Sequence, residues 1–270
     1  MRNRCVGLAL TVVTIFWFSP AMMIARSAQE SGTTVKVAPR TSDGKPDLTG
    51  LWVRTGNTPG SLGNADSFSD EEPPMTPWAA QRYRAAREGV PDPDDQGRED
   101  LDPLLYPYCM PPGLPRLYIR TGTSTFEIGQ TRDRVYMVFE VHSTGRIIYL
   151  DGREHLDGAP DMFMGYSVGR WDGDTLFVET KGLNGLLTWL DSLGHPMTSG
   201  LRMEERIRRA NHDTLEINFL FDDPKAYTRP WTGKKVWELR PDWGLLEYTH
   251  CEERGRREYL EKVLKGDKGP

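Results

Sequence analysis

Short runs in which hydrophobic and polar residues alternate make up most of the chain beyond residue 125. Alternation with a period of two, in runs rich in Val, Ile, Phe and Tyr, is typical of β-strands with one buried face. An earlier run of the same character, "DLTGLWV", predicts a first strand at 47–53. The later runs predict strands at 125–130, 134–141, 146–150, 166–171, 175–180, 201–210, 214–221, 234–240 and 245–251.

Polar turns separate the predicted strands. Asp172-Gly173, "NHD" and "PDWG" each lie between two of them. Asp-Gly and Asn/Asp clusters between β-rich runs are typical of hairpins, and hairpins that follow one another without intervening helices form an antiparallel meander. We therefore expect a mainly β fold with long loops, either an antiparallel up-and-down β-barrel or a sandwich.

One stretch that precedes most of the strands has the pattern of a helix. "TPWAAQRYRAAREG" (76–89) offers Thr76 as N-cap, Pro77 at the first helical position and Gly89 as the stop. Together these patterns divide the chain into a signal peptide (1–28), a polar linker (29–46), a single β domain (47–260) and a flexible tail (261–270).

The signal-peptide prediction rests on three consecutive segments. "MRNR" is positively charged, "CVGLALTVVTIFWF" is apolar, and "SPAMMIARSA" offers small residues for cleavage near Ala28. The alternative is an uncleaved membrane anchor, although the apolar run is short for a span of about 20 residues. We expect a periplasmic or secreted protein with no stable membrane span after cleavage.

Charge and composition narrow the expected partners. The formal net charge of −5 argues against nucleic acid, because proteins that bind it usually present a basic face. The five histidines show no close pair at metal-ligand spacing, and no nucleotide-binding motif is present, so we expect neither a metal nor another cofactor. Cys109 and Cys251 remain after export, either as a disulfide or as free thiols. The sequence assigns no oligomeric state.

The motif "GYSVG" (165–169) has the Gly-x-Ser-x-Gly pattern of a serine-hydrolase nucleophile. That chemistry requires a strand before the serine and a helix after it. Here "GYSVGRW" leads into the turn at Asp172 and then into another strand. We therefore expect Ser167 to lie in a β-hairpin and not to act as a nucleophile.

Several longer segments carry a resemblance: "PDLTGLW", "MTPWAAQRYRA", "DPLLYPYCMPPGLPR", "RIIYLDGREH", "MGYSVGRWDGDTLFVET", "TWLDSLGHP" and "DDPKAYTRPW". Over about 45–255 the chain resembles a large, mostly uncharacterised family of exported bacterial proteins, a resemblance that implies no reaction. Two segments depart from the family pattern. "GHPM" stands where "GHPHS" is common, which weakens a histidine metal site, and "EYTHCEE" has one residue more than usual, which affects the position of Cys251.

A second resemblance concerns the fold. Gly50-Leu51-Trp52 matches the Gly-x-Trp that lipocalin-like (calycin) barrels carry in their first strand. Such barrels hold a small ligand in a central cavity, so this resemblance favours the barrel over the sandwich.

Alternation along 201–210 places a carboxylate among apolar residues. Leu201, Met203, Glu205 and Ile207 share one face, which we expect to point inward. A carboxylate buried in this way has a raised pKa and can act as a general acid or base. The alternative is a structural ion pair between Glu205 and an inward-pointing arginine.

Further candidates follow the strand that ends near residue 150. Asp151 and His155 could form a pair in which the carboxylate orients an imidazole base, or could belong to a polar turn. Tyr166 and Arg170 share one face of a strand, and Trp171 faces the other way. Inside a cavity, Tyr166 and Arg170 would bind and polarise a phenolate or carboxylate. On the solvent face, they would only contact each other.

Aromatic loop segments complete the candidates. Trp189 in "TWLD", and Tyr227 and Trp231 in "AYTRPW", could form a lid or a hydrophobic plug at one end of the barrel. The candidate substrate-binding residues are therefore Arg170, Trp171, Trp189, Tyr227 and Trp231, and the candidate catalytic residues are Glu205, Tyr166, His155 and Asp151.

These residues predict a function in general terms. We expect an exported, cofactor-independent acid–base enzyme of lyase type that acts on a small aromatic or phenolic compound inside the barrel. One alternative is a non-catalytic, lipocalin-like binder of a hydrophobic small molecule. Another is a carbohydrate-active hydrolase, which would need two facing carboxylates from among Asp151, Glu179, Glu205 and Glu247.

Overall fold

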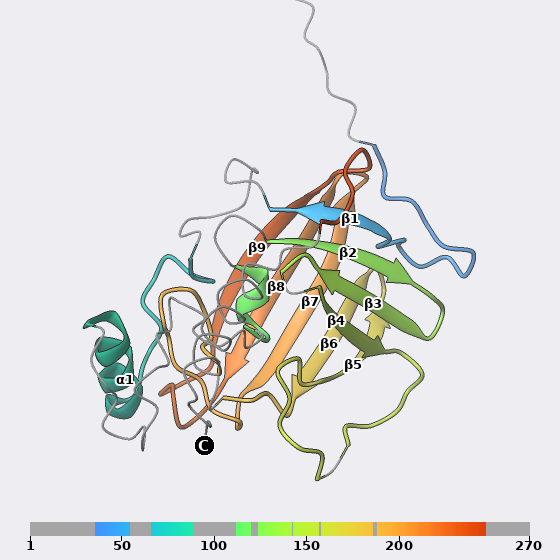
Figure 1. The fold of residues 1–270 in the computed structure, drawn as a ribbon. Coiled ribbons are helices and arrows are strands. Elements are labelled where there is room, and N and C mark those ends of the chain that lie inside the picture. Colours follow the sequence, from blue (N-terminus) through green and yellow to red (C-terminus); the bar gives the residue numbers. More distant parts are fainter. Residues whose placement is uncertain are drawn as a thin grey trace, which may run out of the picture. The chain divides into compact units, whose positions relative to one another are not determined.

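Nine strands close into one barrel, in the order in which they occur along the chain (Figure 1). The computed structural model describes residues 36–54, 66–88, 112–119, 124–141, 143–156, 158–185 and 188–246. The strands are β1 (Gly50–Val53), β2 (Thr125–Gln130), β3 (Arg134–Phe139), β4 (Thr144–Tyr149), β5 (Tyr166–Asp172), β6 (Thr175–Lys181), β7 (Arg202–Asn211), β8 (Thr214–Asp222) and β9 (Trp231–Leu239). The closed sheet excludes the sandwich and confirms the barrel.

The strands alternate in direction around the barrel at every junction except one. Each neighbouring pair is antiparallel, including β1 with β9, whereas β4 and β5 are parallel. An odd number of strands cannot alternate all the way around a closed ring, so one parallel pair is unavoidable. The long connection from 150 to 165 permits it, because parallel neighbours need a crossover and not a tight turn.

Strand positions agree closely with the hydrophobic pattern, with one exception at the C-terminal end. Of the run predicted at 245–251, Leu245 and Leu246 lie in no strand, and residues 247–251 fall outside the described part. β9 pairs with β8 and with β1. The described residues thus give β9 two partners that close the barrel, and the predicted hairpin across "PDWG" stays a prediction.

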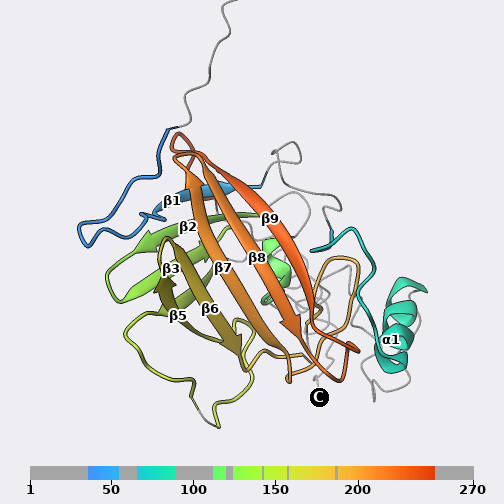
Figure 2. The same ribbon diagram turned by 180° about the vertical axis from the view of Figure 1, so that it is seen from behind.

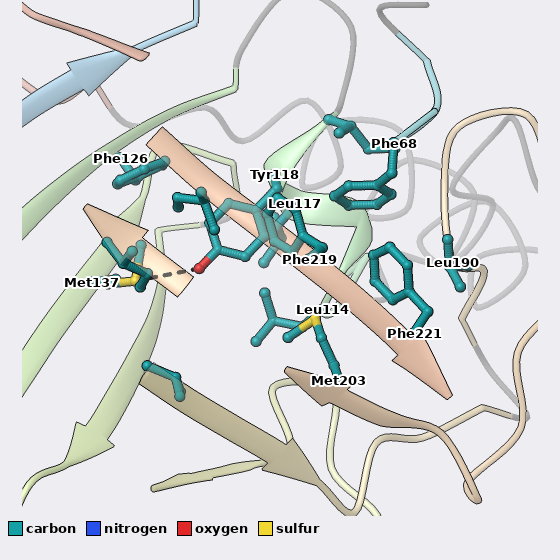
Figure 3. Packing of buried hydrophobic residues seen from close by; sticks show 14 of the residues in the cluster. Phe68, Leu114, Leu117, Tyr118, Phe126, Met137, Leu190, Met203, Phe219 and Phe221 are labelled. Atoms are coloured by element: carbon teal, nitrogen blue, oxygen red, sulfur yellow. Dashed lines mark hydrogen bonds between the residues drawn. The ribbon is translucent and has the colours of Figure 1, made fainter. Parts of the chain in front are cut away.

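The interior of the barrel is filled by a segment of the chain itself. Residues 112–119, which include a short 3-10 helix η1 (Arg116–Tyr118), bury Leu114, Leu117, Tyr118 and Ile119 almost completely. Figure 3 shows Leu117 and Tyr118 among the aromatic side chains of the barrel wall. The ring of Tyr118 makes edge contacts at 5.3–5.8 Å with Phe126, Phe139, Phe219 and Trp237.

This packing corrects the expectation of a central ligand cavity. The space in which a lipocalin-like barrel would hold its ligand contains η1 and the side chains around it, and these form the hydrophobic core. Burying side chains of this size is worth about 2 kcal/mol each, so several of them together hold the segment firmly in place.

One end of the barrel is closed by loops. Phe68 packs edge-on against Phe219 and Phe221 at 4.8 and 4.9 Å (Figure 3), and Leu190 belongs to the same buried cluster. The connections β6–β7 and β8–β9 meet here with the loop before the helix. Three backbone hydrogen bonds join the loops, from Ser192 N to Asp66 O, from Thr76 N to Ala226 O and from Thr228 N to Pro74 O.

The helix α1 (Pro77–Glu88) follows directly, as the sequence predicts. The Thr76 hydroxyl accepts a hydrogen bond from Ala79 N at 3.2 Å, which confirms Thr76 as the N-cap. Figure 2 shows α1 beyond the ends of the long strands β7, β8 and β9. In the described part of the chain, no helix is long and apolar enough to cross a membrane.

Several sequence predictions concern residues outside the described part. They are the signal peptide, the flexible tail, and both Cys109 and Cys251. Of the predicted linker, residues 36–46 are described. Here Arg40 and Pro46 form an isolated β-bridge, and Arg40 pairs with Asp174 of the β5–β6 turn at 2.7 Å, so this part is ordered.

Candidate functional site

Glu205 points into the barrel, as the alternation along β7 predicts, and is completely buried. Its carboxylate accepts hydrogen bonds from the Tyr118 hydroxyl at 2.8 Å and from Arg146 Nη1 at 2.9 Å, and a second ion-pair contact joins it to Arg146 Nη2. Arg146 comes from β4, which lies across the barrel. The arrangement matches the structural alternative, in which an inward glutamate pairs with an inward arginine.

The remaining donors of Arg146 are also used. Its Nε donates to Ser167 Oγ at 3.0 Å, and its Nη2 donates to Thr180 Oγ1 at 2.8 Å. Burial alone would lower the pKa of Arg146, but the Glu205 carboxylate outweighs this and raises it. Burial is also the main cause that raises the pKa of Tyr118. The cluster is therefore closed upon itself, with its charges matched.

Ser167 lies in a β-hairpin, as expected. It is buried on β5, which runs directly into β6 and pairs with it. Its hydroxyl lies 3.0 Å from that of Thr180 and accepts from Arg146. The serine thus supports the buried ion pair and has neither the helix nor the exposure of a nucleophile elbow.

Asp151 and His155 do not form the expected pair. Asp151 binds Arg153 through both carboxylate oxygens, whereas Nε2 of His155 lies 3.1 Å from Glu179 Oε1 on the outer face of β6. Burial, followed by the charge of Lys181, lowers the pKa of His155 despite Glu179.

Tyr166 and Arg170 share one face of β5, and Trp171 faces the other way, as predicted. The shared face is the outer one, so the expectation that they line a cavity inside the barrel is not met. Tyr166 stacks on Tyr149 of β4 at 5.3 Å, and Arg170 lies over Phe177 at 4.3 Å. Trp171 is directed inward and packs against the core.

The loop before β7 contains a pair that the sequence reasoning missed. Asp191 and His195 are buried, and His195 Nδ1 is hydrogen-bonded to Asp191 Oδ2. Because a carboxylate can only accept, Nδ1 carries the proton of this bond. The other oxygen, Oδ1, accepts from the backbone N–H groups of Leu193 and His195 at 3.1 and 3.0 Å. The aspartate therefore fixes both the position and the tautomer of the imidazole.

The second ring nitrogen of His195 is directed at an exposed acid. Its Nε2 lies 3.4 Å from Oε1 of Glu72, whose side chain is 60 % exposed. Burial alone would lower the pKa of His195, but the hydrogen bond to Asp191 and the charges of Asp191 and Glu72 outweigh it and raise the pKa above 6.5. The pair has the form of an oriented acid–base group whose second nitrogen faces the carboxylate of Glu72.

One aromatic side chain stacks on this pair, and two more lie near Arg82 of the same helix. The ring of Tyr83 from α1 stacks on the imidazole at 4.4 Å and 5°. Arg82, also from α1, lies 5.3 Å from the ring centre of Trp78 and 5.7 Å from that of Trp189. Trp189, which the sequence singled out for substrate binding, thus belongs to the same loop as the histidine.

Tyr227 and Trp231 also lie at this end. The Tyr227 hydroxyl donates to the carbonyl oxygen of Pro196 at 2.7 Å, and its ring contacts that of Trp231 at 5.5 Å. Both are buried, so they form part of the plug and not an open lid. Trp231 Nε1 nevertheless has no hydrogen-bond partner among the described residues, and the same holds for the buried hydroxyls of Ser67 and Ser192.

A weak signal for the missed pair is present in the sequence. Asp191 and His195 stand four residues apart in "DSLGHP", where Gly194 and Pro196 predict a turn. Spacing along the sequence does not show that such a turn folds the carboxylate back onto the imidazole, because that contact depends on the conformation of the loop. In the described part of the chain, no group of three or more His, Cys, Asp and Glu side chains is placed to hold a metal ion.

A groove of about 690 Å³ lies on the outer face of β7, β8 and β9. Two rows of outward side chains form its floor, and the loop that carries Phe68 forms its wall. The lining residues are Phe68, Ser69, Asp70, Glu71, Glu204, Arg206, Asn218, Phe219, Leu220, Thr232, Gly233 and Lys234.

Comparison of the chain with protein-family models, with curated proteins and with solved structures gives no match.

Proposed function

We propose that the protein is an acid–base enzyme of lyase type that acts on a small aromatic or phenolic compound, with His195 as the group that moves the proton. The observation that carries the proposal is the buried Asp191–His195 pair, whose second nitrogen, Nε2, contacts the exposed carboxylate of Glu72. The proposal keeps the reaction class expected from the sequence and assigns it to different residues.

Asp191 would hold the imidazole ready for both directions of proton transfer. With Nδ1–H bound to the aspartate, only Nε2 is available to take a proton from a substrate or return it. The imidazolium that forms is stabilised by the buried carboxylate, which itself stays ionised. Burial would lower the pKa of His195, but the hydrogen bond and charge of Asp191 together with Glu72 raise it, so the protonated imidazole that would return a proton to the substrate is favoured.

Glu72 would connect the imidazole to solvent. Its exposed carboxylate accepts from protonated Nε2 in the free protein, and a substrate would take its place. A 3.4 Å contact to an exposed side chain costs little to break, because such ion pairs contribute at most about 1 kcal/mol.

The surrounding side chains support the substrate class. Trp189 and Trp78 provide ring faces, and Arg82 provides a positive charge that suits a phenolate or carboxylate. The buried N–H of Trp231, which has no partner in the described part of the chain, would donate to an oxygen of the ligand.

The proposal is tested by turnover of small phenolic acids and hydroxybenzoates, followed by ultraviolet absorbance with the purified mature protein. We expect turnover of at least one compound, and a loss of about 10²–10⁴-fold in His195→Gln, which is the usual scale for a general acid or base. Asp191→Asn should lose activity as well, because an amide at this position no longer keeps the proton on Nδ1 of His195. His155→Gln is the matched control and should stay within a few-fold of the wild type, since His155 lies on the outer face.

The non-catalytic alternative is favoured by the groove, which has the volume of a small-molecule site. Binding of the same compounds, measured by tryptophan fluorescence, separates the two functions. Binding without turnover, unchanged in His195→Gln, would establish a binder and end the enzyme proposal. Of the carboxylates that the hydrolase would need, Glu205 lies inside the barrel and cannot face the other two, whereas Asp151 is paired with Arg153 and Glu179 with Lys181 and Arg202 outside it.

A further inference from the structure

The floor of the groove is made of outward side chains from three neighbouring strands. In one row, Arg206 of β7, Asn218 of β8 and Lys234 of β9 stand side by side, because the register pairs each with the next. The second row consists, in the same order, of Glu204, Leu220 and Thr232. Arg206, Asn218 and Thr232 are exposed. The accessible part of the floor therefore offers mainly hydrogen-bonding groups.

Arg206 is a cation of the groove whose charge is not matched. It forms no hydrogen bond or ion pair in the described part of the chain, and the contact that is observed is with a ring, Phe177, 5.9 Å away. The other charges of the floor have partners, since Lys234 pairs with Glu216 at 3.2 Å and Glu204 pairs with Arg202. The guanidinium of Arg206 therefore keeps its donors for a ligand.

A second arginine of the same kind lies beside it. Arg170 of β5 is exposed and, among the described residues, also has no hydrogen bond or ion pair. Phe177 of β6 stands between Arg170 and Arg206 in the register, and Arg170 lies 4.3 Å from the centre of this ring. Two positive charges against one ring repel each other, and an anion close to both relieves that repulsion. This arrangement points to a negatively charged ligand.

The wall of the groove adds the opposite charge. The lining includes Asp70 and Glu71, and Glu71 is exposed, with a carboxylate that has no partner in the part of the chain that the structure describes. Such carboxylates repel a bare anion, but they accept hydrogen bonds from hydroxyl groups. The groove therefore suits a ligand that carries carboxylates toward the floor and hydroxyls toward the wall.

We propose that the groove binds an acidic oligosaccharide, a short chain of uronic-acid sugars. A sugar carboxylate accepts two parallel hydrogen bonds from Arg206, and the ring hydroxyls bind Asn218, Thr232 and the acids of the wall. The row that starts at Lys234 continues over β6 to Arg170, across five strands or about 20 Å of sheet, which favours a chain over a single sugar. The lining does not include His195, so this site goes beyond the proposed function.

Calorimetric titration with α-1,4-linked trigalacturonate tests the site. The salt is about 0.15 M NaCl, at which charges more than about 8 Å away are largely screened. We expect saturable binding of one trimer per chain, and an affinity at least about tenfold lower in Arg206→Gln, which loses charge-assisted hydrogen bonds. Arg208→Gln is the matched control and should stay within about twofold, because Arg208 is the next exposed outward residue of β7 and lies outside the groove lining.

Two further ligands define the chemical class. Neutral galactotriose of the same linkage lacks the carboxylates, and triglutamate lacks the sugar hydroxyls, so each should bind at least about tenfold more weakly than trigalacturonate. Equal affinity for triglutamate would show a surface for acidic peptides and would overturn the proposal. Absence of trigalacturonate binding, or an unchanged affinity in Arg206→Gln, would overturn it too.

This proposal and that for His195 fail independently. His195→Gln should bind trigalacturonate with the affinity of the wild type, because His195 is not part of the groove lining. Loss of the oligosaccharide site would in turn leave proton transfer by His195 untouched. A weaker affinity in His195→Gln would place the trimer at the Asp191–His195 pair and would overturn its assignment to the groove.

Discussion

At the scale of single residues, the role of the buried Glu205 carboxylate depends on the side chain that it contacts. Glu205 was placed inward correctly, but its role depends on Arg146, which is 59 residues away in the sequence. The same alternation places Arg146 and Ile148 inward on β4, so the inward direction of Arg146 could also have been predicted from the sequence. What alternation cannot supply is the pairing of these two side chains across the barrel.

The buried pair gives a prediction about stability. Glu205→Gln leaves the Arg146 charge buried and without a counter-ion, so the free energy of unfolding should fall by about 3–5 kcal/mol in urea denaturation. Glu127→Gln, on the exposed face of β2, is the matched control and should change it by less than about 0.5 kcal/mol.

A double variant distinguishes the loss of a partner from a loss of packing. Arg146→Met with Glu205→Met removes both charges and should be less destabilised than either single change. If Glu205→Gln proved as stable as the wild type yet lost turnover, Glu205 would not be a structural ion-pair partner. It would then be a catalytic residue, as the sequence first suggested.

At the scale of elements, segments outside the strands determine what the barrel can do. The 112–119 segment fills the interior, and the loop that carries Phe68 covers one end beside β9. Both lie outside the strands and the helix that the sequence predicts, since prolines interrupt regular elements there. Their apolar residues find partners only once the barrel has formed.

The close contact between Phe68 and β9 is tested by adding a single methyl group. Gly233→Ala places a Cβ within 2.6 Å of the Phe68 Cβ, so the loop must shift, and the free energy of unfolding should fall by about 1–3 kcal/mol. Gly129→Ala is the matched strand control, since nothing lies within 4 Å of its Cβ position. Equal stability of the two variants, measured in the same denaturation series, would show that Phe68 does not pack on β9.

At the scale of the whole molecule, stability should depend on pH through two histidines with opposite shifts. The pKa of His195 is raised in the folded state, so its contribution to stability is fully present below pH 6.5 and is lost as the pH rises through the folded pKa. The pKa of His155 is lowered, so its contribution is present above pH 6.5 and is lost as the pH falls through the folded pKa.

Comparison of variants separates these effects. The difference in unfolding free energy between the wild type and His195→Gln should shrink from pH 5.5 to pH 8.5, whereas the difference for His155→Gln should grow. Urea denaturation at steps of about one pH unit measures both. A His195 difference that stays constant across this range would mean that Asp191 does not hold a protonated imidazole.

The sequence by itself determined the strands, the helix N-cap at Thr76, the inward direction of Glu205 and the hairpin around Ser167, because each follows from local periodicity or turn chemistry. The tertiary structure alone decided that η1 fills the cavity, that Tyr166 and Arg170 lie outside, and that Glu205 meets Arg146. A period of two fixes which residues share a face. Which face is enclosed, and which distant side chains meet there, depends on how the sheet closes.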